Sequence, residues 1–155
     1  MLKVYNVLNH KKEEFVPQKE NQVAMYACGI TASGSAHIGH AYQAVIFDVI
    51  RSYLEYTGYQ VTYVRNYTDV DDKIIIKARE LGVDPAEYAK KMMSEIDSEF
   101  DKLGVVKPTI QSKATECIDD MIAFISRLIE TGHAYATEYG DVYFKVSSFA
   151  KYGSS

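Results

Sequence analysis

The stretch from Met25 to Ala41 constrains this chain more than any other part of the sequence. An apolar segment, Val23–Ala27, leads into it and is typical of a buried strand. A loop that contains several glycines follows, and an amphipathic helix begins near His40. In α/β folds, a strand, a glycine-containing turn and a helix bring a phosphate to backbone N–H groups and a helix N-terminus. The pattern therefore predicts a nucleotide site at this turn.

Two histidines stand at the start of the predicted helix, in the run His37-Ile38-Gly39-His40. Imidazoles three residues apart can both face a phosphate and donate hydrogen bonds to oxygens that gain charge during attack at phosphorus. Gly39 lets a nucleotide approach the backbone closely. The four residues alone leave an incidental surface pair open as the alternative, but their place after a strand and a glycine-containing loop favours nucleotide chemistry.

Cys28 ends the apolar segment and precedes Gly29. Spacing alone favours a small buried core residue, the commonest role of a lone cysteine. The alternatives are a contact with substrate and a zinc ligand, although a zinc site ordinarily takes three or more protein ligands. His37 and His40 could join Cys28 in principle, but histidines that bind phosphate are poor candidates for metal ligands.

The segments around this turn predict one βαβ unit. Residues 39–56 have apolar side chains at helical spacing, and Gln60–Asn66 alternates as a strand does. We expect a single parallel pair of strands, because strand, helix and strand follow each other within about 45 residues. The carboxyl ends of the strands, at Cys28-Gly29 and at residues 66–68, should then converge at the edge where such sheets bind ligands.

Capping residues and the periodicity of apolar residues predict the bounds of the remaining helices and strands. Lys11–Glu14 is expected to be a solvated turn. Helices are expected over 69–81, 85–103 and 115–131, and a hairpin is expected around 138–140. The acids in the first turn of the first of these helices (Asp69, Asp71 and Asp72) favour capping and the helix dipole over a Mg²⁺ site.

The composition excludes several classes of protein. The 155 residues correspond to the length of one ordinary domain. The net charge of −4 indicates that the chain does not bind nucleic acid by charge alone. Its 2 cysteines form no disulfide framework, which indicates a reducing compartment. No apolar run has the length of a membrane span, and the first residues lack the apolar core of a signal peptide. We therefore expect a cytoplasmic protein with no membrane partner.

Several motifs together resemble one family. The chain is similar to the N-terminal part of cysteinyl-tRNA synthetases, which are class I aminoacyl-tRNA synthetases. The match includes Val4-Tyr5-Asn6, Met25–Thr31, His37–His40, Tyr63–Asn66, Thr68–Lys73 and Gly140–Phe144. The strongest part is the Cys-Gly-x-Thr element ahead of His-Ile-Gly-His.

This resemblance implies an α/β fold, namely the N-terminal half of a Rossmann-type (HUP-like) class I synthetase catalytic domain. Residues 1–110 would form the first half of that domain, and residues 111–155 would be a helix and hairpin leading into an incomplete connective insertion. The family activates cysteine with ATP, accompanied by Mg²⁺, and transfers it to tRNA(Cys). The partners implied for the full-length protein are thus cysteine, ATP and that tRNA.

The resemblance also implies roles for individual residues. Cys28 would be one ligand of a Zn²⁺ ion that binds the cysteine thiolate and thereby rejects serine, which reverses the interpretation from spacing alone. Cys28, Gly29 and Thr68 would bind the amino acid. His37 and His40 would be catalytic and stabilise the α-phosphate. The ATP site would comprise Ile30, Thr31, His37, Gly39 and His40.

The chain departs from the family pattern at two places. Residues 32–36 replace an aromatic residue and an aspartate with small residues, and Tyr42-Gln43 stands where an arginine is usual. The other zinc ligands, the second half of the sheet, the Lys-Met-Ser-Lys-Ser loop and the tRNA-binding region are expected beyond residue 155. The chain alone is therefore expected to be inactive and not to bind tRNA. Two alternatives stay open: an ATP-dependent ligase of cysteine and an amino-sugar, and a non-catalytic paralogue that binds a nucleotide or a protein.

Overall fold

The computed structural model describes residues 2–153, which form two compact units. The larger unit is Pro17–Glu116, and the smaller one combines Met1–Val16 with Cys117–Ser155. The division into 1–110 and 111–155 expected from the family resemblance stays a prediction.

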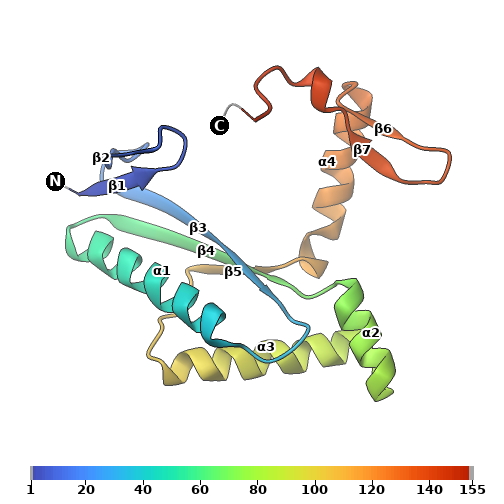
Figure 1. The fold of residues 1–155 in the computed structure, drawn as a ribbon, viewed down its shortest axis with the longest axis horizontal. Helices are drawn as coiled ribbons and strands as arrows, with labels where there is room; N and C mark the ends of the chain where they lie inside the picture. The colour runs from blue at the N-terminus through green and yellow to red at the C-terminus, as the bar shows by residue number, and fades with distance from the viewer. Residues whose placement is uncertain (1, 154–155) are drawn as a thin grey trace. The chain divides into compact units, whose positions relative to one another are not determined.

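A parallel sheet of three strands forms the centre of the larger unit (Figure 1). The strands are β3 (Gln22–Thr31), β4 (Gln60–Thr68) and β5 (Ile110–Lys113), in the order β3-β4-β5. The parallel pairing of β3 with β4 is confirmed. The expectation of a single pair is wrong, because β5 pairs with residues 64–67 of β4. Strand β5 was missed because only one of its four residues is aliphatic. The segment therefore lacks the apolar alternation that marks a strand.

Two helices cover the same face of this sheet: α1 (Ile38–Tyr56) and α3 (Pro85–Lys102). In Figure 1 both run beneath the strands. The core between helices and strands contains Ile30, Ala44, Tyr67, Ile96, Phe100 and Val105. The four-residue spacing of the apolar positions in α3 correctly predicted its buried face, and Asp84 with Pro85 starts this helix as expected.

The short helix α2 (Asp72–Leu81) packs against the first half of α3. Their shared core contains Ala32, Ile74, Ala78, Tyr88, Ala89 and Met92. The Asp71 side chain caps α2 by accepting a hydrogen bond from the backbone N–H of Lys73 at 2.8 Å. Gly82 ends the helix with φ of 67°, a left-handed conformation that glycine adopts without strain.

The smaller unit contains two antiparallel strand pairs and one long helix. Strands β1 (Lys3–Asn6) and β2 (Lys11–Glu14) form the first pair, so the expectation that Lys11–Glu14 is a turn is wrong. The charges that suggested a turn lie on an exposed ribbon, where Glu13 accepts a hydrogen bond from Asn6 Nδ2 at 2.8 Å. The predicted hairpin is confirmed as β6 (Ala134–Ala136) and β7 (Val142–Phe144).

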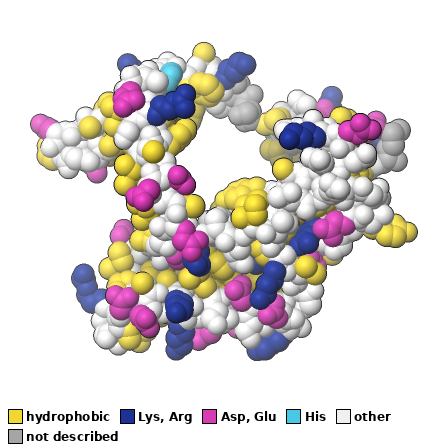
Figure 2. Space-filling model, turned by 180° about the vertical axis from the view of Figure 1, so that it is seen from behind, with side chains coloured by type: hydrophobic (Ala, Val, Ile, Leu, Met, Phe, Trp, Pro, Cys, Tyr) yellow, Lys and Arg dark blue, Asp and Glu magenta, His cyan; other side chains and the backbone are white. Residues whose placement is uncertain are grey.

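Helix α4 (Ile118–Glu130) follows a 3₁₀ turn over Thr115–Cys117, so it begins later than expected. Its apolar stripe is the predicted one, yet no residue of α4 is buried in the part of the chain that the structure describes. Figure 2 shows hydrophobic side chains along this helix, where Ile122 is 57% and Phe124 64% exposed. Among residues 2–153, no helix combines the length and apolar character that crossing a bilayer requires.

Ile96 is a fully buried side chain of the larger unit, and its truncation tests the packing between α3 and the sheet. It is 0% exposed between α3 and the sheet, so Ile96→Ala should lower the free energy of unfolding by about 2–5 kcal/mol through lost burial and a residual cavity. Urea titration followed by circular dichroism measures this change. Ile76→Ala is the matched control, since Ile76 is 57% exposed and its truncation should change stability by at most about 0.5 kcal/mol. Equal losses in both variants would contradict the packing described.

Candidate functional site

The carboxyl ends of β3 and β4 lie side by side, as predicted, but the expectation that Cys28-Gly29 ends its strand is wrong, because β3 continues to Thr31. Thr31 lies opposite Thr68 in the register, and the N–H of Ala32 donates to the carbonyl of Thr68 at 2.9 Å. The structure thus brings Thr31 and Thr68 to the carboxyl edge of the sheet, and Cys28 and Gly29 lie within β3 shortly before this edge. Open edges of this kind in parallel sheets are where α/β proteins bind ligands.

The register between β3 and β4 shifts between Ala27 and Ile30, which marks a β-bulge. Gly29 lies at this shift and contacts β4 directly. A Cβ atom on Gly29 would lie 1.4 Å from the carbonyl oxygen of Asn66, a distance no real side chain can occupy. Glycine is therefore required at position 29 for the strands to approach so closely.

Cys28 is exposed beside the bulge, so the structure does not support the interpretation of a buried core cysteine. Both polar groups of the peptide that joins it to Gly29 are hydrogen-bonded to side chains. The N–H of Gly29 donates to Asn66 Oδ1 at 2.8 Å, and Gln43 Nε2 donates to the Cys28 carbonyl at 3.2 Å. Tyr26 also donates its hydroxyl to Asn66 Oδ1, at 2.9 Å.

Sequence reasoning noted Asn66 as a strand end and as part of a motif shared with the family, and Gln43 only as a departure from the family pattern, and it gave neither residue a role. The signal that could have identified Gln43 is its spacing, because it follows His40 by three residues and lies on the same face of α1.

The two histidines form the N-terminal cap of α1. His37 is the cap residue, and its Nδ1 accepts a hydrogen bond from the N–H of Gly39 at 3.1 Å. In return, the N–H of His37 donates to Nδ1 of His40 at 3.3 Å. The rings stack with centroids 3.7 Å apart. A Cβ on Gly39 would lie 3.0 Å from Cε1 of His37, so glycine leaves room for the capping ring.

This arrangement determines which nitrogens of the histidines are available. Because both Nδ1 atoms accept hydrogen bonds, a neutral ring carries its proton on Nε2. Burial, followed by repulsion from His37, lowers the pKa of His40 below its ordinary value of 6.5. At neutral pH, His40 is thus a neutral donor through Nε2. Two imidazole donors at a helix N-terminus suit an anionic oxygen.

The remaining residues of the expected ATP site differ in accessibility. The side chain of Ile30 is buried in the core between sheet and helices, so any nucleotide contact must come from its backbone. Thr31 is half-buried. Ala32 is 0% exposed within the α2–α3 core, and the Tyr88 hydroxyl donates to the carbonyl of Ser33 at 3.0 Å. The small residues of this loop thus let it pack against α3.

The acidic run after β4 divides into two structural roles. Asp71 and Asp72 begin α2, as the capping interpretation predicted. Asp69 differs, because it is only 9% exposed and lies outside the helix. Its carboxylate accepts hydrogen bonds from both the N–H and the hydroxyl of Thr115. Asp69 therefore ties the end of β4 to the segment that follows β5.

The residues present do not by themselves fit a zinc centre. Across residues 2–153, no three His, Cys, Asp or Glu side chains are grouped so that they could hold a metal ion. The histidines use their Nδ1 atoms within the helix cap, which leaves Cys28 as a single thiol donor. A zinc site that includes Cys28 would therefore need its other ligands from outside the described residues.

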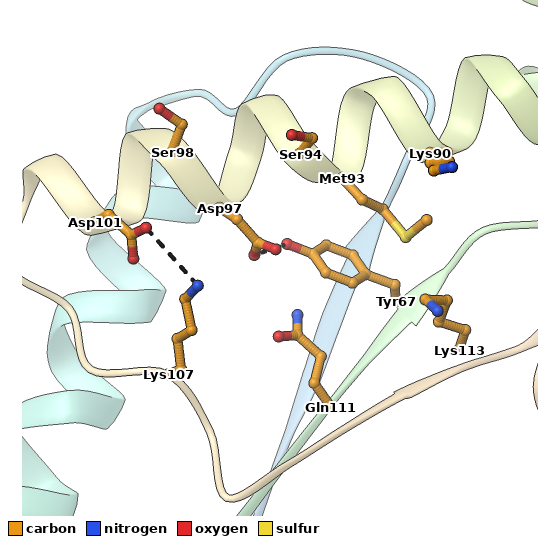
Figure 3. Close-up of a pocket in the computed structure, with 10 residues that line it drawn as sticks. All are labelled: Tyr67, Lys90, Met93, Ser94, Asp97, Ser98, Asp101, Lys107, Gln111 and Lys113. Atoms are coloured by element: carbon orange, nitrogen blue, oxygen red, sulfur yellow. Dashed lines mark hydrogen bonds and ion pairs between the residues drawn. The ribbon is translucent and has the colours of Figure 1, made fainter.

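A cavity of about 580 Å³ lies elsewhere, between α3 and strands β4 and β5 (Figure 3). At its centre the hydroxyl of Tyr67 donates to Asp97 Oδ1 at 2.7 Å. Burial, and then this hydrogen bond, raise the pKa of Tyr67, so it stays a neutral donor. Lys107 pairs with Asp101 at 3.9 Å across the rim. None of the predicted site residues is among those that line this cavity. The hydrogen bond between Tyr67 and Asp97 connects α3 to the sheet.

The fold is that of an α/β domain of the Rossmann type. A family model described as "tRNA synthetases class I (C) catalytic domain" matches residues 14–155. The chain therefore belongs to this family.

Curated relatives named cysteine–tRNA ligase match almost the whole chain. One from Maridesulfovibrio salexigens is 53% identical over 152 residues, covering 98% of this chain and 31% of the relative. One from Trichlorobacter lovleyi is 49% identical, covering 97% and 31%. A third, from Actinobacillus pleuropneumoniae, is 47% identical and covers 99% and 34%. The chain thus spans about a third of the length of these relatives.

A solved structure supports the fold independently. The chain superposes with a TM-score of 0.62 on LeuRS agnB2 of Agrobacterium radiobacter K84, solved as a ternary complex with tRNA and LeuAMS. The match covers 72% of this chain and 15% of that one, at 19% identity. The likeness confirms a Rossmann-like fold of the class I synthetase type.

The pKa of His40 provides a test of the cap geometry. Because folding lowers this pKa, the stability contributed by neutral His40 is full above pH 6.5 and is lost as the pH falls. An NMR titration of the His40 ring should give a midpoint below 6.5. In His37→Ala the midpoint should move upward, because the repulsion from His37 and the stacked ring are gone. An unchanged midpoint in that variant would contradict the stacked pair.

Proposed function

We propose that the complete protein carrying this chain activates cysteine with ATP and transfers the cysteinyl group to tRNA(Cys). The observation that carries this proposal is the turn between β3 and α1, where an exposed thiol, Cys28, precedes two stacked histidines at a helix N-terminus. The names of the curated relatives support the same reaction. The 155 residues alone are proposed to be inactive and not to bind tRNA.

Adenylate formation is a displacement at phosphorus. The carboxylate oxygen of cysteine attacks the α-phosphorus of ATP, one P–O bond forms, and the bond to the bridging oxygen breaks to release pyrophosphate. His37 and His40 would donate from Nε2 to non-bridging oxygens whose charge grows in the transition state. Gly39 and the backbone of Ile30 and Thr31 would contact the nucleotide, and Mg²⁺ would accompany ATP as part of that substrate.

The amino acid would bind at the edge of the sheet. Thr68 ends β4 there, Cys28 and Gly29 lie shortly before this edge on β3, and no side chain can stand at position 29 because it would meet the carbonyl of Asn66. The half-buried Thr68 offers a hydroxyl at the end of β4. We propose Cys28 as the residue that faces the substrate's side chain. A zinc ion at this thiol would depend on ligands outside the described residues, so no step is assigned to it.

Two further parts of the proposal follow from the family. Residues 111–155 would lead into the connective insertion of the synthetase, after a first half-domain over 1–110. A protein of this activity would work in the cytoplasm, where its tRNA and amino acid are found. The free apolar stripe of α4 is compatible with an element that packs on further chain.

Pyrophosphate exchange by the complete protein tests these roles. Cysteine should stimulate the exchange of pyrophosphate. The variant His40→Ala should slow this exchange about 10²–10³-fold, because a hydrogen bond to the transition state is lost. The variant Cys28→Ala should abolish the preference for cysteine over serine. Cys117→Ala is the matched control and should leave the exchange rate unchanged. Normal cysteine-dependent exchange in either site variant would remove that residue from its role. ATP consumption that depends on an amino-sugar and not on tRNA would indicate the related ligase instead.

A further inference from the structure

The peptide between Cys28 and Gly29 is fixed by side chains from two other elements. In an extended strand the N–H and the carbonyl of one peptide point to opposite sides, so only one of them can pair with β4, the strand beside β3 in this sheet. The register shift between Ala27 and Ile30 removes residues 28 and 29 from this pairing. Asn66 from β4 accepts from the N–H of Gly29, and Gln43 from α1 donates to the carbonyl of Cys28. One peptide unit is thus held at both of its polar groups.

The backbone determines the orientation of both side-chain amides. The N–H of Gly29 can only donate, so the atom of Asn66 that lies 2.8 Å away is the amide oxygen. The carbonyl of Cys28 can only accept, so the atom of Gln43 that lies 3.2 Å away is the amide nitrogen. Asn66 therefore acts as an acceptor at this peptide, and Gln43 acts as a donor.

Each of the two side chains is connected to another part of the site. Asn66 Oδ1 also accepts from the Tyr26 hydroxyl at 2.9 Å, which fixes the amide oxygen from a second direction. Gln43 lies three residues after His40 on α1, so its hydrogen bond links the helix that carries the histidines to the strand that carries Cys28. Because Cys28 is exposed, packing of its own side chain does not hold it in place.

We propose that Gln43 and Asn66 are positioning residues, which set the place of Cys28 at the edge of the sheet through the Cys28–Gly29 peptide. The role in amino-acid binding rests on the proposed function, whereas the hydrogen bonds do not. Neither side chain is assigned a contact with substrate. Their effect is on the affinity for the amino acid, and the nucleotide side of the turn is held separately by the histidine cap.

Replacing each amide with the acid of the same shape separates this proposal from a general effect of added charge. A carboxylate still accepts from the N–H of Gly29, so Asn66→Asp should keep the KM for cysteine within about twofold. A carboxylate cannot donate to the Cys28 carbonyl, so Gln43→Glu should raise that KM roughly three- to tenfold, the range for one lost hydrogen bond. The KM for ATP should stay unchanged in both variants. Exchange assays on the complete protein measure these constants.

Two more variants complete the comparison. Asn66→Leu removes the acceptor and should raise the KM for cysteine as Gln43→Glu does. Gln60→Glu is the matched control, because it adds the same charge at an exposed amide outside the bulge and should change nothing. The proposal is overturned if Asn66→Asp and Gln43→Glu change the KM for cysteine by the same factor. It is also overturned if these variants lower kcat and leave the KM for cysteine unchanged.

Amide hydrogen exchange at Gly29 gives a readout that needs no activity. The N–H of Gly29 should be protected in the unchanged protein and in Asn66→Asp, and it should exchange faster in Asn66→Leu. If the complete protein shows no cysteine-dependent exchange of pyrophosphate, the proposed function fails, and this protection pattern alone decides whether Asn66 holds the peptide. Equal protection of Gly29 in Asn66→Asp and Asn66→Leu would overturn the positioning role.

Discussion

The close approach of Gly29 to the carbonyl of Asn66 is the constraint on which the rest of the site depends. It allows β3 to bulge against β4 without breaking the parallel pair. At the bulge the N–H of Gly29 donates to the side chain of Asn66, and the Cys28 carbonyl, on the opposite side of the same peptide, accepts from Gln43. Cys28 is thereby presented at the edge of the sheet on a rigid strand, and a side chain at position 29 would remove this geometry.

The second part of the site depends on how α1 begins. Its cap is made by two imidazoles that satisfy backbone N–H groups with Nδ1 and keep Nε2 for a ligand. Packing holds this helix in place, because Ala44 lies in the same core as Ile96 and Phe100 of α3. The loop before the helix is anchored by Tyr88. The histidine cap and the Cys28–Gly29 peptide are therefore built separately, and Gln43 joins them.

Much of this arrangement could be predicted from the sequence, because strong local signals coincide with it. Apolar runs and glycine-containing turns predicted β3, α1 and β4, and the rule for βαβ units predicted that their ends converge. The sequence could not indicate β5, whose pairing depends on a neighbour far along the chain, nor the role of Asp69, whose partner Thr115 lies 46 residues away. Cys28 was assigned from family resemblance, since spacing alone favoured a buried residue.

The central claim is that this site is one part of a catalytic centre that residues outside the chain complete. The size of the native polypeptide tests this most directly, using an antibody raised to these residues on an extract of the source cells. The account predicts a band much larger than 17.5 kDa, because the chain spans only 31% to 34% of the ligases it matches. A single band at 17.5 kDa would contradict it and would leave a half-domain that binds a ligand without turnover.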